Sequence, residues 1–232
     1  MAKQIVITGV AQGLGRALAE EFIALGHTVH GCDIRTEQIG NLQQQHPIPH
    51  SFAAVNLTNE EQVQSWATSV LASGPPDLLI NNAGFIPPLA PLWTVPAGDF
   101  ERAIAVNLGG IAATIRAFVP AMVERRQGVI VNISAKWGRK GAANAGPFCA
   151  SKWGVEGLTQ CLALELPEGM AAVTVAPGAI ATEALAVVHG TEKASTYPTP
   201  GDWGAIAAPF LLSITPEQNG QPLSIPKPEP NS

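Results

Sequence analysis

The sequence predicts an α/β fold built on a parallel β-sheet. Short apolar runs rich in β-branched residues alternate with longer segments of helical composition. The runs are mostly apolar and are bounded by turn residues, as expected for strands that are covered on both faces. The first run leads into a glycine-rich turn, and a helix follows at once. A chain of 232 residues is long enough for one such domain with its own hydrophobic core.

The elements follow from the apolar runs and the turn residues between them. Strands are expected at 4–8, 28–33, 51–55, 77–81, 129–134, 172–175 and 223–225, and helices at 14–25, 60–71, 99–126, 148–166 and 202–213. This alternation predicts βαβ units with right-handed crossovers. Residues 183–200 have loop composition. Residues 226–232 hold three prolines and are expected to be a disordered tail.

Composition excludes several classes of protein. The net charge is −5 and charged residues make up 13% of the chain, so a nucleic-acid binder is not expected. Such a low share also predicts a surface that is partly neutral or covered by a partner. The three cysteines show neither zinc-ligand nor disulfide spacing. No secretory signal is visible, and Pro177, Gly178 and Glu183 interrupt the apolar stretch 170–188. We therefore expect a soluble cytoplasmic protein without a membrane span.

The glycine-rich turn predicts a dinucleotide site. Gly9, Gly13 and Gly15 lie between the first strand and the first helix. Glycines at these positions let the backbone turn tightly and approach a pyrophosphate, which then lies at the positive end of the helix. The alternative is a tight turn that serves only to pack the helix on the strand.

The spacing of this turn, TGxxxGxG, resembles that of the short-chain dehydrogenase/reductase family. Four further motifs follow in the family's order, namely Asn81-Asn82-Ala83-Gly84, Val106-Asn107, Ala150-Ser151-Lys152 and Pro177-Gly178-Ala179-Ile180-Ala181-Thr182. Together the motifs and strands span residues 4–225. The resemblance implies a single Rossmann-like domain, residues 1–225, with a doubly wound seven-stranded parallel sheet. It also implies a nicotinamide cofactor, and a homo-dimer or homo-tetramer formed through the two long helices. Residues 183–200 fall where the family has its substrate loop, so the resemblance implies a mobile lid there, with a fixed loop as the alternative.

Residue roles can be carried over where this sequence matches the family's motifs. The resemblance implies that the cofactor is bound by Gly9, Gln12, Gly13, Leu14, Gly15, Asp33, Ile34, Arg35, Asn56, Leu57, Asn82, Ala83, Gly84, Lys152, Pro177, Gly178, Ile180 and Thr182. It implies oxidation and reduction of a small carbonyl or alcohol substrate. No metal site is expected.

Within the family, the segments around Trp137, Phe148 and Leu166 are similar to a branch that includes pterin aldehyde reductases. A pterin-like substrate is therefore one candidate. Trp137 could stack on a planar ring, and Arg139 could pair with an anion or a ring carbonyl. Ordinary loop packing and solvation is the alternative for both residues.

Two residues give opposite indications about the cofactor. Asp33 ends the second predicted strand, where an acidic side chain binds the adenosine ribose hydroxyls and repels a 2′-phosphate. This favours NAD. Arg35 can instead pair with a 2′-phosphate, so NADP is the alternative. Asn56 stands where the family usually has an aspartate toward adenine, and its side-chain oxygen can still accept a hydrogen bond.

Two of the family's four catalytic positions lack their hydroxyl. Phe148 occupies the position of the tyrosine acid/base, and Ala135 that of the serine that holds the substrate carbonyl. Lys152 and Asn107 remain; the family uses the lysine to hold the nicotinamide ribose and lower the tyrosine pKa, and the asparagine to support a relay water. Ser134 should point away from the pocket because successive strand residues face opposite sides. The single tyrosine, Tyr197, is remote in sequence.

These replacements predict a catalytically impaired or inactive oxidoreductase scaffold. Two origins fit: a natural non-catalytic relative, or deliberate replacement of two hydroxyls in an active enzyme. Two other functions stay open, a non-catalytic NAD(P)-binding sensor or scaffold protein and an enzyme that runs different chemistry in the same pocket.

Overall fold

The fold is one parallel sheet, described here by a computed structural model for residues 1–226. Seven strands pair in the order β3-β2-β1-β4-β5-β6-β7, all in parallel. Their bounds are β1 Gln4–Thr8, β2 Thr28–Asp33, β3 Ser51–Ala54, β4 Leu78–Asn81, β5 Gly128–Ile133, β6 Met170–Ala176 and β7 Pro222–Ser224. The order reverses direction between β1 and β4, which confirms the doubly wound seven-stranded sheet that the sequence predicts.

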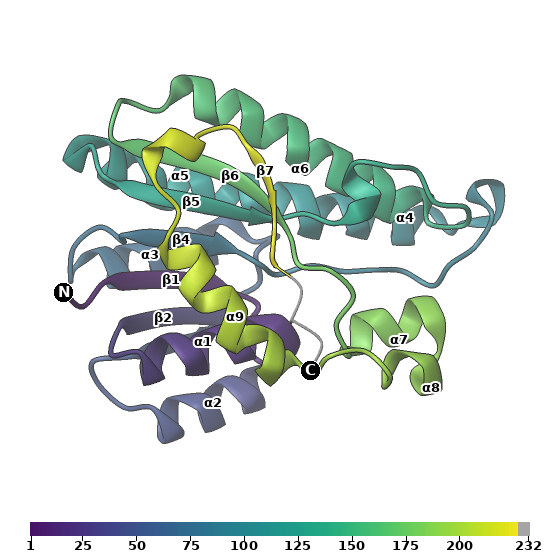
Figure 1. Ribbon diagram of the computed structural model, residues 1–232, viewed down its shortest axis with the longest axis horizontal. Coiled ribbons are helices and arrows are strands. Elements are labelled where there is room, and N and C mark those ends of the chain that lie inside the picture. Colours follow the sequence, from purple (N-terminus) through teal and green to yellow (C-terminus); the bar gives the residue numbers. More distant parts are fainter. Residues whose placement is uncertain (227–232) are drawn as a thin grey trace.

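Helices cover both faces of the sheet (Figure 1). Their bounds are α1 Gly13–Ala24, α2 Thr36–Gln45, α3 Glu60–Leu71, α4 Ala97–Ile104, α5 Gly110–Arg125, α6 Gly146–Glu165, α7 Glu183–His189, α8 Thr191–Ala194 and α9 Pro200–Leu212. Along β1, Ile5 and Ile7 pack in one core with α1, α2 and α9, whereas Val6 packs in the other with α3, α5 and α6. Alternate strand residues therefore supply two separate hydrophobic cores.

The predicted helix at 99–126 is observed as one continuous helical segment with a local irregularity. A π-helical turn, η2 Ala105–Gly109, joins α4 to α5 and carries the buried Asn107. The stretch Ala97–Arg125 is 29 residues long and apolar enough, by composition, to cross a membrane. Half of its most apolar window is buried in the fold, and α5 packs on α3 while α4 packs on α6. Its apolar face is thus accounted for by core packing.

Two expectations about the elements need correction. The segment 183–200 is not a loop throughout, because it contains α7 and α8, which stand beside the sheet (Figure 1). Thr182 caps α7, because its hydroxyl accepts a hydrogen bond from the Leu185 amide. This helix start signal is the last residue of the motif 177–182. The sequence reading also missed α2, where Ile39 and Leu42 alone are buried. Of the expected tail, 227–232 lies outside the described residues.

Candidate active site

The glycine turn between β1 and α1 leaves room for a ligand at the start of a helix. Gly9 has a φ of +77°, and a Cβ there would approach the Ala83 Cα to 2.8 Å. A Cβ on Gly15 would run into the carbonyl oxygen of Gly9. The residue before α1, Gln12, makes no side-chain capping bond, and the first turn holds no acidic residue. The positive end of α1 is therefore open to an anion, as a dinucleotide pyrophosphate requires.

The end of β4 is fastened to this turn by hydrogen bonds. The backbone amides of Asn82 and Ala83 each donate to the Thr8 hydroxyl at 3.0 Å. The Asn82 side chain donates to the carbonyl oxygens of Thr8, at 2.9 Å, and Gly9, at 3.2 Å. The TGxxxGxG and NNAG motifs thus meet across the sheet. Asn82 holds the turn in shape.

The adenosine end of the site is built from the ends of β2 and β3. The Asp33 carboxylate accepts bonds from the backbone amides of Ala11, at 3.2 Å, and Arg35, at 3.1 Å. Asn56 uses its side-chain oxygen within its own loop, because that oxygen accepts from the Thr58 amide at 3.0 Å and hydroxyl at 2.9 Å. The predicted adenine acceptor on Asn56 is therefore already engaged in holding the loop.

At the reacting end, Lys152 is buried and Phe148 lies beside it. The Lys152 ammonium donates to the Ile133 carbonyl at 2.8 Å. Burial lowers the pKa of Lys152 to about 8, opposed in part by the negative Glu156. The Phe148 ring centre lies 5.7 Å from the lysine Nζ, and Trp137 packs edge-on against this ring at 6.1 Å. The residue in the tyrosine position thus faces the lysine, one helical turn away on α6.

Asn107, predicted as a catalytic residue, is buried and does not line the cavity, and its side chain bonds to Phe85 and Ser151. Its side-chain oxygen accepts from the Phe85 amide at 2.6 Å. Its amide group donates to the Phe85 carbonyl at 2.8 Å and to the Ser151 hydroxyl at 2.9 Å. In this arrangement Asn107 fixes the segment that follows the NNAG motif.

Arg139 belongs to a buried network that joins β5, β6, β7 and α6. Its guanidinium donates to Glu156 at 2.9 Å, to the Thr174 hydroxyl at 3.1 Å and to the Leu223 carbonyl at 3.0 Å. The hydroxyl of Ser134 donates to Glu156 at 2.6 Å. The Ser134 hydroxyl thus turns to α6, but the residue also lines the large cavity, so the expectation that it points away from the pocket needs correction. The predicted pairing of Arg139 with a substrate competes with these structural contacts. The sequence analysis does not identify Glu156 as a member of this network, because no motif distinguishes it from other residues of the predicted helix.

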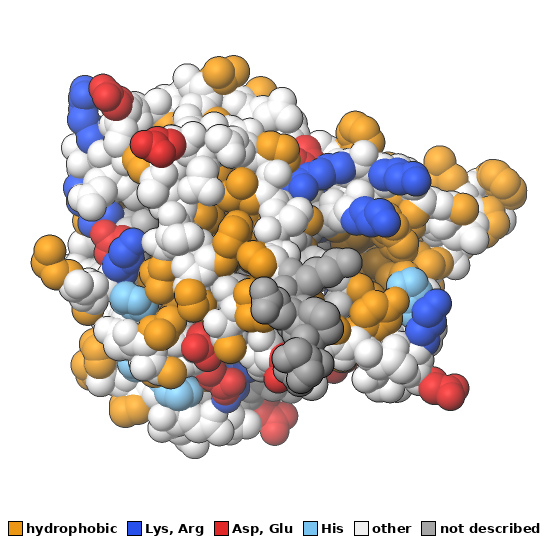
Figure 2. Space-filling model, in the orientation of Figure 1, with side chains coloured by type: hydrophobic (Ala, Val, Ile, Leu, Met, Phe, Trp, Pro, Cys, Tyr) orange, Lys and Arg blue, Asp and Glu red, His pale blue; other side chains and the backbone are white. Residues whose placement is uncertain are grey.

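A single cavity of about 1590 Å³ collects these groups at the carboxyl ends of the strands. Its lining includes every residue predicted to touch cofactor or substrate except Gly15, which lies in the turn below it. Ala135, Phe148 and Lys152 share its wall. Figure 2 shows a hollow with hydrophobic side chains in it and Lys and Arg side chains along one rim. The lining contains three basic residues of one loop, Lys136, Arg139 and Lys140.

Several lining residues escaped the sequence reading. Phe85 follows the NNAG motif, and the Arg102 guanidinium lies 4.2 Å from its ring centre. Tyr197, remote from the motifs in sequence, also lines the cavity and stacks on His189 at 6.0 Å. The fold of α7 and α8 brings both of these lid residues to the site. The lid expected at 183–200 predicts that this segment approaches the site, but no pattern in the sequence singles out His189 or Tyr197.

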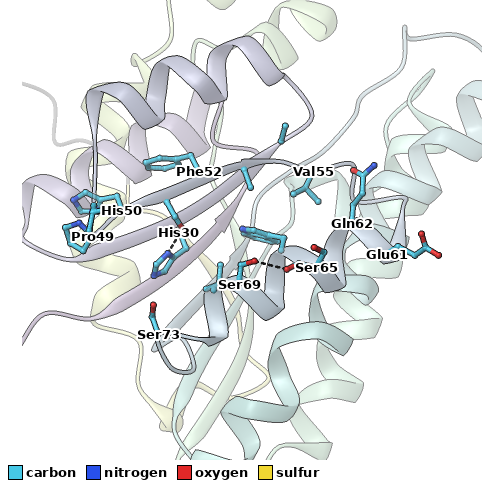
Figure 3. A pocket seen from close by; sticks show the side chains of 16 residues that line it. His30, Pro49, His50, Phe52, Val55, Glu61, Gln62, Ser65, Ser69 and Ser73 are labelled. Atoms are coloured by element: carbon cyan, nitrogen blue, oxygen red, sulfur yellow. Dashed lines mark hydrogen bonds between the residues drawn. The ribbon is translucent and has the colours of Figure 1, made fainter.

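A second, smaller pocket of about 690 Å³ lies away from the strand ends, between β3 and α3 (Figure 3). His30 and Ser69 line it, and it contains none of the motif residues. Burial, with a smaller effect of His50, lowers the pKa of His30, so this side chain is neutral at pH 7. Apart from Gly15 and Asn107, the residues predicted to bind the dinucleotide or to take part in catalysis all line the larger cavity.

The fold and the assembled motifs define the class of protein: the chain belongs to the short-chain dehydrogenase family, whose model matches residues 3–193. The chain is 42% identical to an NADPH-dependent pterin aldehyde reductase of Arabidopsis thaliana, over 97% of this chain and 93% of the relative. A 2-dehydro-3-deoxy-L-rhamnonate dehydrogenase (NAD⁺) of a Sphingomonas strain is 35% identical over 69% of this chain and 65% of its own length.

Solved structures agree with this assignment. ElxO with NADP bound superposes with a TM-score of 0.85 at 27% identity, over 97% of both chains. A variant of ElxO in which a tyrosine is replaced by phenylalanine, solved with NADPH bound, matches equally well. The chain is thus a member of the family by sequence and by fold.

Proposed function

We propose that this chain is an NAD(P)-binding oxidoreductase scaffold for carbonyl and alcohol interconversion whose turnover is strongly reduced or absent. The observation that carries the proposal is the Phe148 ring beside the buried Lys152, in a cavity that otherwise keeps the family's motifs. Neither residue 148 nor residue 135 supplies a hydroxyl.

The chemistry explains why two missing hydroxyls matter. A bound nicotinamide supplies or accepts a hydride at the substrate carbon. The carbonyl oxygen must gain a proton as its carbon is reduced, and Phe148 has none to give. Ala135 cannot orient that oxygen. Loss of a positioned general acid lowers a rate by about 10²- to 10⁴-fold. Lys152, with its pKa lowered to about 8 by burial, is the titratable group that remains beside Phe148.

For the cofactor we propose NAD(H) first, because the Asp33 carboxylate stands at the end of β2, where it repels a 2′-phosphate. Arg35 supports NADP(H) as the second candidate, and so do the NADPH named for the Arabidopsis relative and the NADP bound to ElxO. The name of the Sphingomonas relative supports NAD.

For the substrate we propose a flat aromatic carbonyl compound of pterin type. The edge-on pair of Trp137 and Phe148 gives the reacting end of the cavity an aromatic wall. The name of the Arabidopsis relative supports the same class. Cytoplasmic location and a homo-dimer or homo-tetramer are part of the proposal. Support comes from the three free cysteines and from the exposed Trp153 and Leu164 of α6, at 53% and 89% exposure.

The test compares the chain with Phe148→Tyr, Ala135→Ser and the double variant. Turnover of a pterin aldehyde and of benzaldehyde is measured with NADH and with NADPH. We expect Phe148→Tyr to raise turnover by about 10²-fold or more, since it restores the general acid. Ala135→Ser alone should change little, and the two changes should be non-additive because the groups act as a unit.

Phe100→Tyr is the matched control, because it adds a phenol on α4 outside the cavity lining. Cofactor binding is measured calorimetrically for every variant. If the unmodified chain turns over as fast as the double variant, another group is the acid and the impairment is refuted.

A non-catalytic NAD(P)-binding sensor or scaffold is the second candidate, and the missing hydroxyls favour it as well. It predicts tight cofactor binding without turnover in the unmodified chain and no substrate turnover even in the double variant.

A further inference from the structure

The Glu183 carboxylate connects three segments that are far apart in the sequence. Its Oε2 accepts a bond from the Gln12 side chain at 2.9 Å and one from the Arg35 guanidinium at 3.3 Å. Glu183 begins α7, Gln12 precedes α1 and Arg35 precedes α2. All three residues line the large cavity. A single side chain of the lid is thereby tied to both turns that are expected to hold the cofactor.

The Glu183 carboxylate lies close to the glycine turn and the N-terminus of α1, where the cofactor phosphates are expected to bind. Thr182, the neighbour of Glu183, comes within 3.6 Å of where a Cβ on Gly13 would lie, so the lid start runs close over the glycine turn. The α1 N-terminus has neither a side-chain cap nor an acidic residue of its own. The bonds from Gln12 and Arg35 lower the pKa of Glu183, so the carboxylate is charged at neutral pH. A resident anion therefore sits at the rim of the phosphate site.

The pairing also decides what Arg35 can offer a ligand. Asp33 disfavours a 2′-phosphate, and Arg35 is the nearby cation that could compensate for it. In the structure that guanidinium faces Glu183. A 2′-phosphate arriving there meets the Asp33 and Glu183 carboxylates and has to displace Glu183 from the Arg35 guanidinium. A ribose 2′-hydroxyl carries no such charge.

We propose that Glu183 is a specificity-determining latch, which holds the lid to the cofactor cleft and competes with a 2′-phosphate for Arg35. The proposal rests on the proposed cofactor-binding function and deepens it. Glu183 thereby weakens NADP(H) binding more than NAD(H) binding. The contact between Glu183 and Arg35 must break both when the lid opens and when a 2′-phosphate binds.

The test uses calorimetric dissociation constants for NADP⁺ and NAD⁺. Glu183→Gln keeps the size of the side chain and removes its charge. The Glu183 and Arg35 side chains are 73% and 38% exposed, so the ion pair is of the weak surface kind. We expect Glu183→Gln to tighten NADP⁺ binding about two- to fivefold more than NAD⁺ binding, as loss of an exposed ion pair allows. In an Arg35→Gln background that difference should vanish.

Glu37→Gln is the matched control. Glu37 lies in the first turn of α2, close to Arg35 in sequence, but outside the cavity lining. Glu37→Gln removes the same charge but leaves the contact between Glu183 and Arg35 in place. Its effect on the ratio of the NADP⁺ and NAD⁺ dissociation constants should therefore be clearly smaller. An equal effect in the control, an equal change for both dinucleotides, or a change that persists with Arg35→Gln would each overturn the proposal.

A second readout needs no cofactor. Lys193 lies on α8 within the lid, and trypsin cleavage there reports lid opening. Cleavage should be about two- to fivefold faster in Glu183→Gln than in the unmodified chain or in Glu37→Gln, by the same ion-pair magnitude. An unchanged rate refutes the latch. If no variant binds either dinucleotide, the proposed function fails instead, while the cleavage comparison still decides whether the latch exists.

Discussion

Replacing the buried Lys152 by methionine should stabilise the cofactor-free protein at pH 7. The folded state lowers the pKa of this lysine from 10.5 to about 8, chiefly through burial. At 1.36 kcal/mol for each pKa unit, the charged form costs about 3 kcal/mol in the folded state. Methionine removes that cost and also removes the hydrogen bond to the Ile133 carbonyl, which contributes about 1 kcal/mol. The net gain at pH 7 is therefore about 2 kcal/mol.

The sign of the effect depends on pH. Below pH 8 the lysine is charged in both states, so the full penalty applies. Between pH 8 and 10.5 the folded protein loses the proton while the unfolded chain keeps it. The free energy of unfolding of the unmodified chain therefore rises by about 3 kcal/mol across this window. The advantage of Lys152→Met should shrink accordingly and reverse near the top of it.

Urea unfolding followed by tryptophan fluorescence, at several pH values between 7 and 10.5 and at one protein concentration, measures both free energies. Lys140→Met is the control, because Lys140 is exposed and its replacement should give a difference that does not vary with pH. A Lys152→Met variant that is less stable at pH 7, or whose difference from the unmodified chain is flat with pH, would refute the reasoning.

Two further outcomes follow from the fold. Gly15→Ala should abolish binding of NAD(H) and NADP(H) in calorimetry, because its Cβ would run into the carbonyl oxygen of Gly9; unchanged affinity would mean that the turn does not hold the cofactor. Light scattering at micromolar concentration should find a dimer or tetramer, and Trp153→Glu with Leu164→Glu on the exposed face of α6 should convert it to a smaller species; a monomeric unmodified chain would contradict this expectation.

The sequence alone determined the sheet, because its signals are local. The bounds predicted for Gln4–Thr8 and Thr28–Asp33 are those that the structure has, since the first run ends at the glycine turn and the second at a charged residue. The glycine turn, the NNAG motif and Lys152 likewise identified the cavity, because each sits at the carboxyl end of a strand or one turn along a helix. The absence of hydroxyls at positions 148 and 135 is evident from the sequence without any structure.

Only the tertiary structure decided how the charged side chains pair. Arg139 was predicted toward a substrate, yet its guanidinium joins Glu156, Thr174 and β7, which lie at remote places in the sequence. The Glu183 carboxylate meets Gln12 and Arg35 across the whole chain, and Tyr197 reaches the cavity through α7 and α8. Apolar periodicity records which face of an element is buried, but it carries no information on which distant partner a charged side chain will meet. That choice depends on the packing of several elements at once.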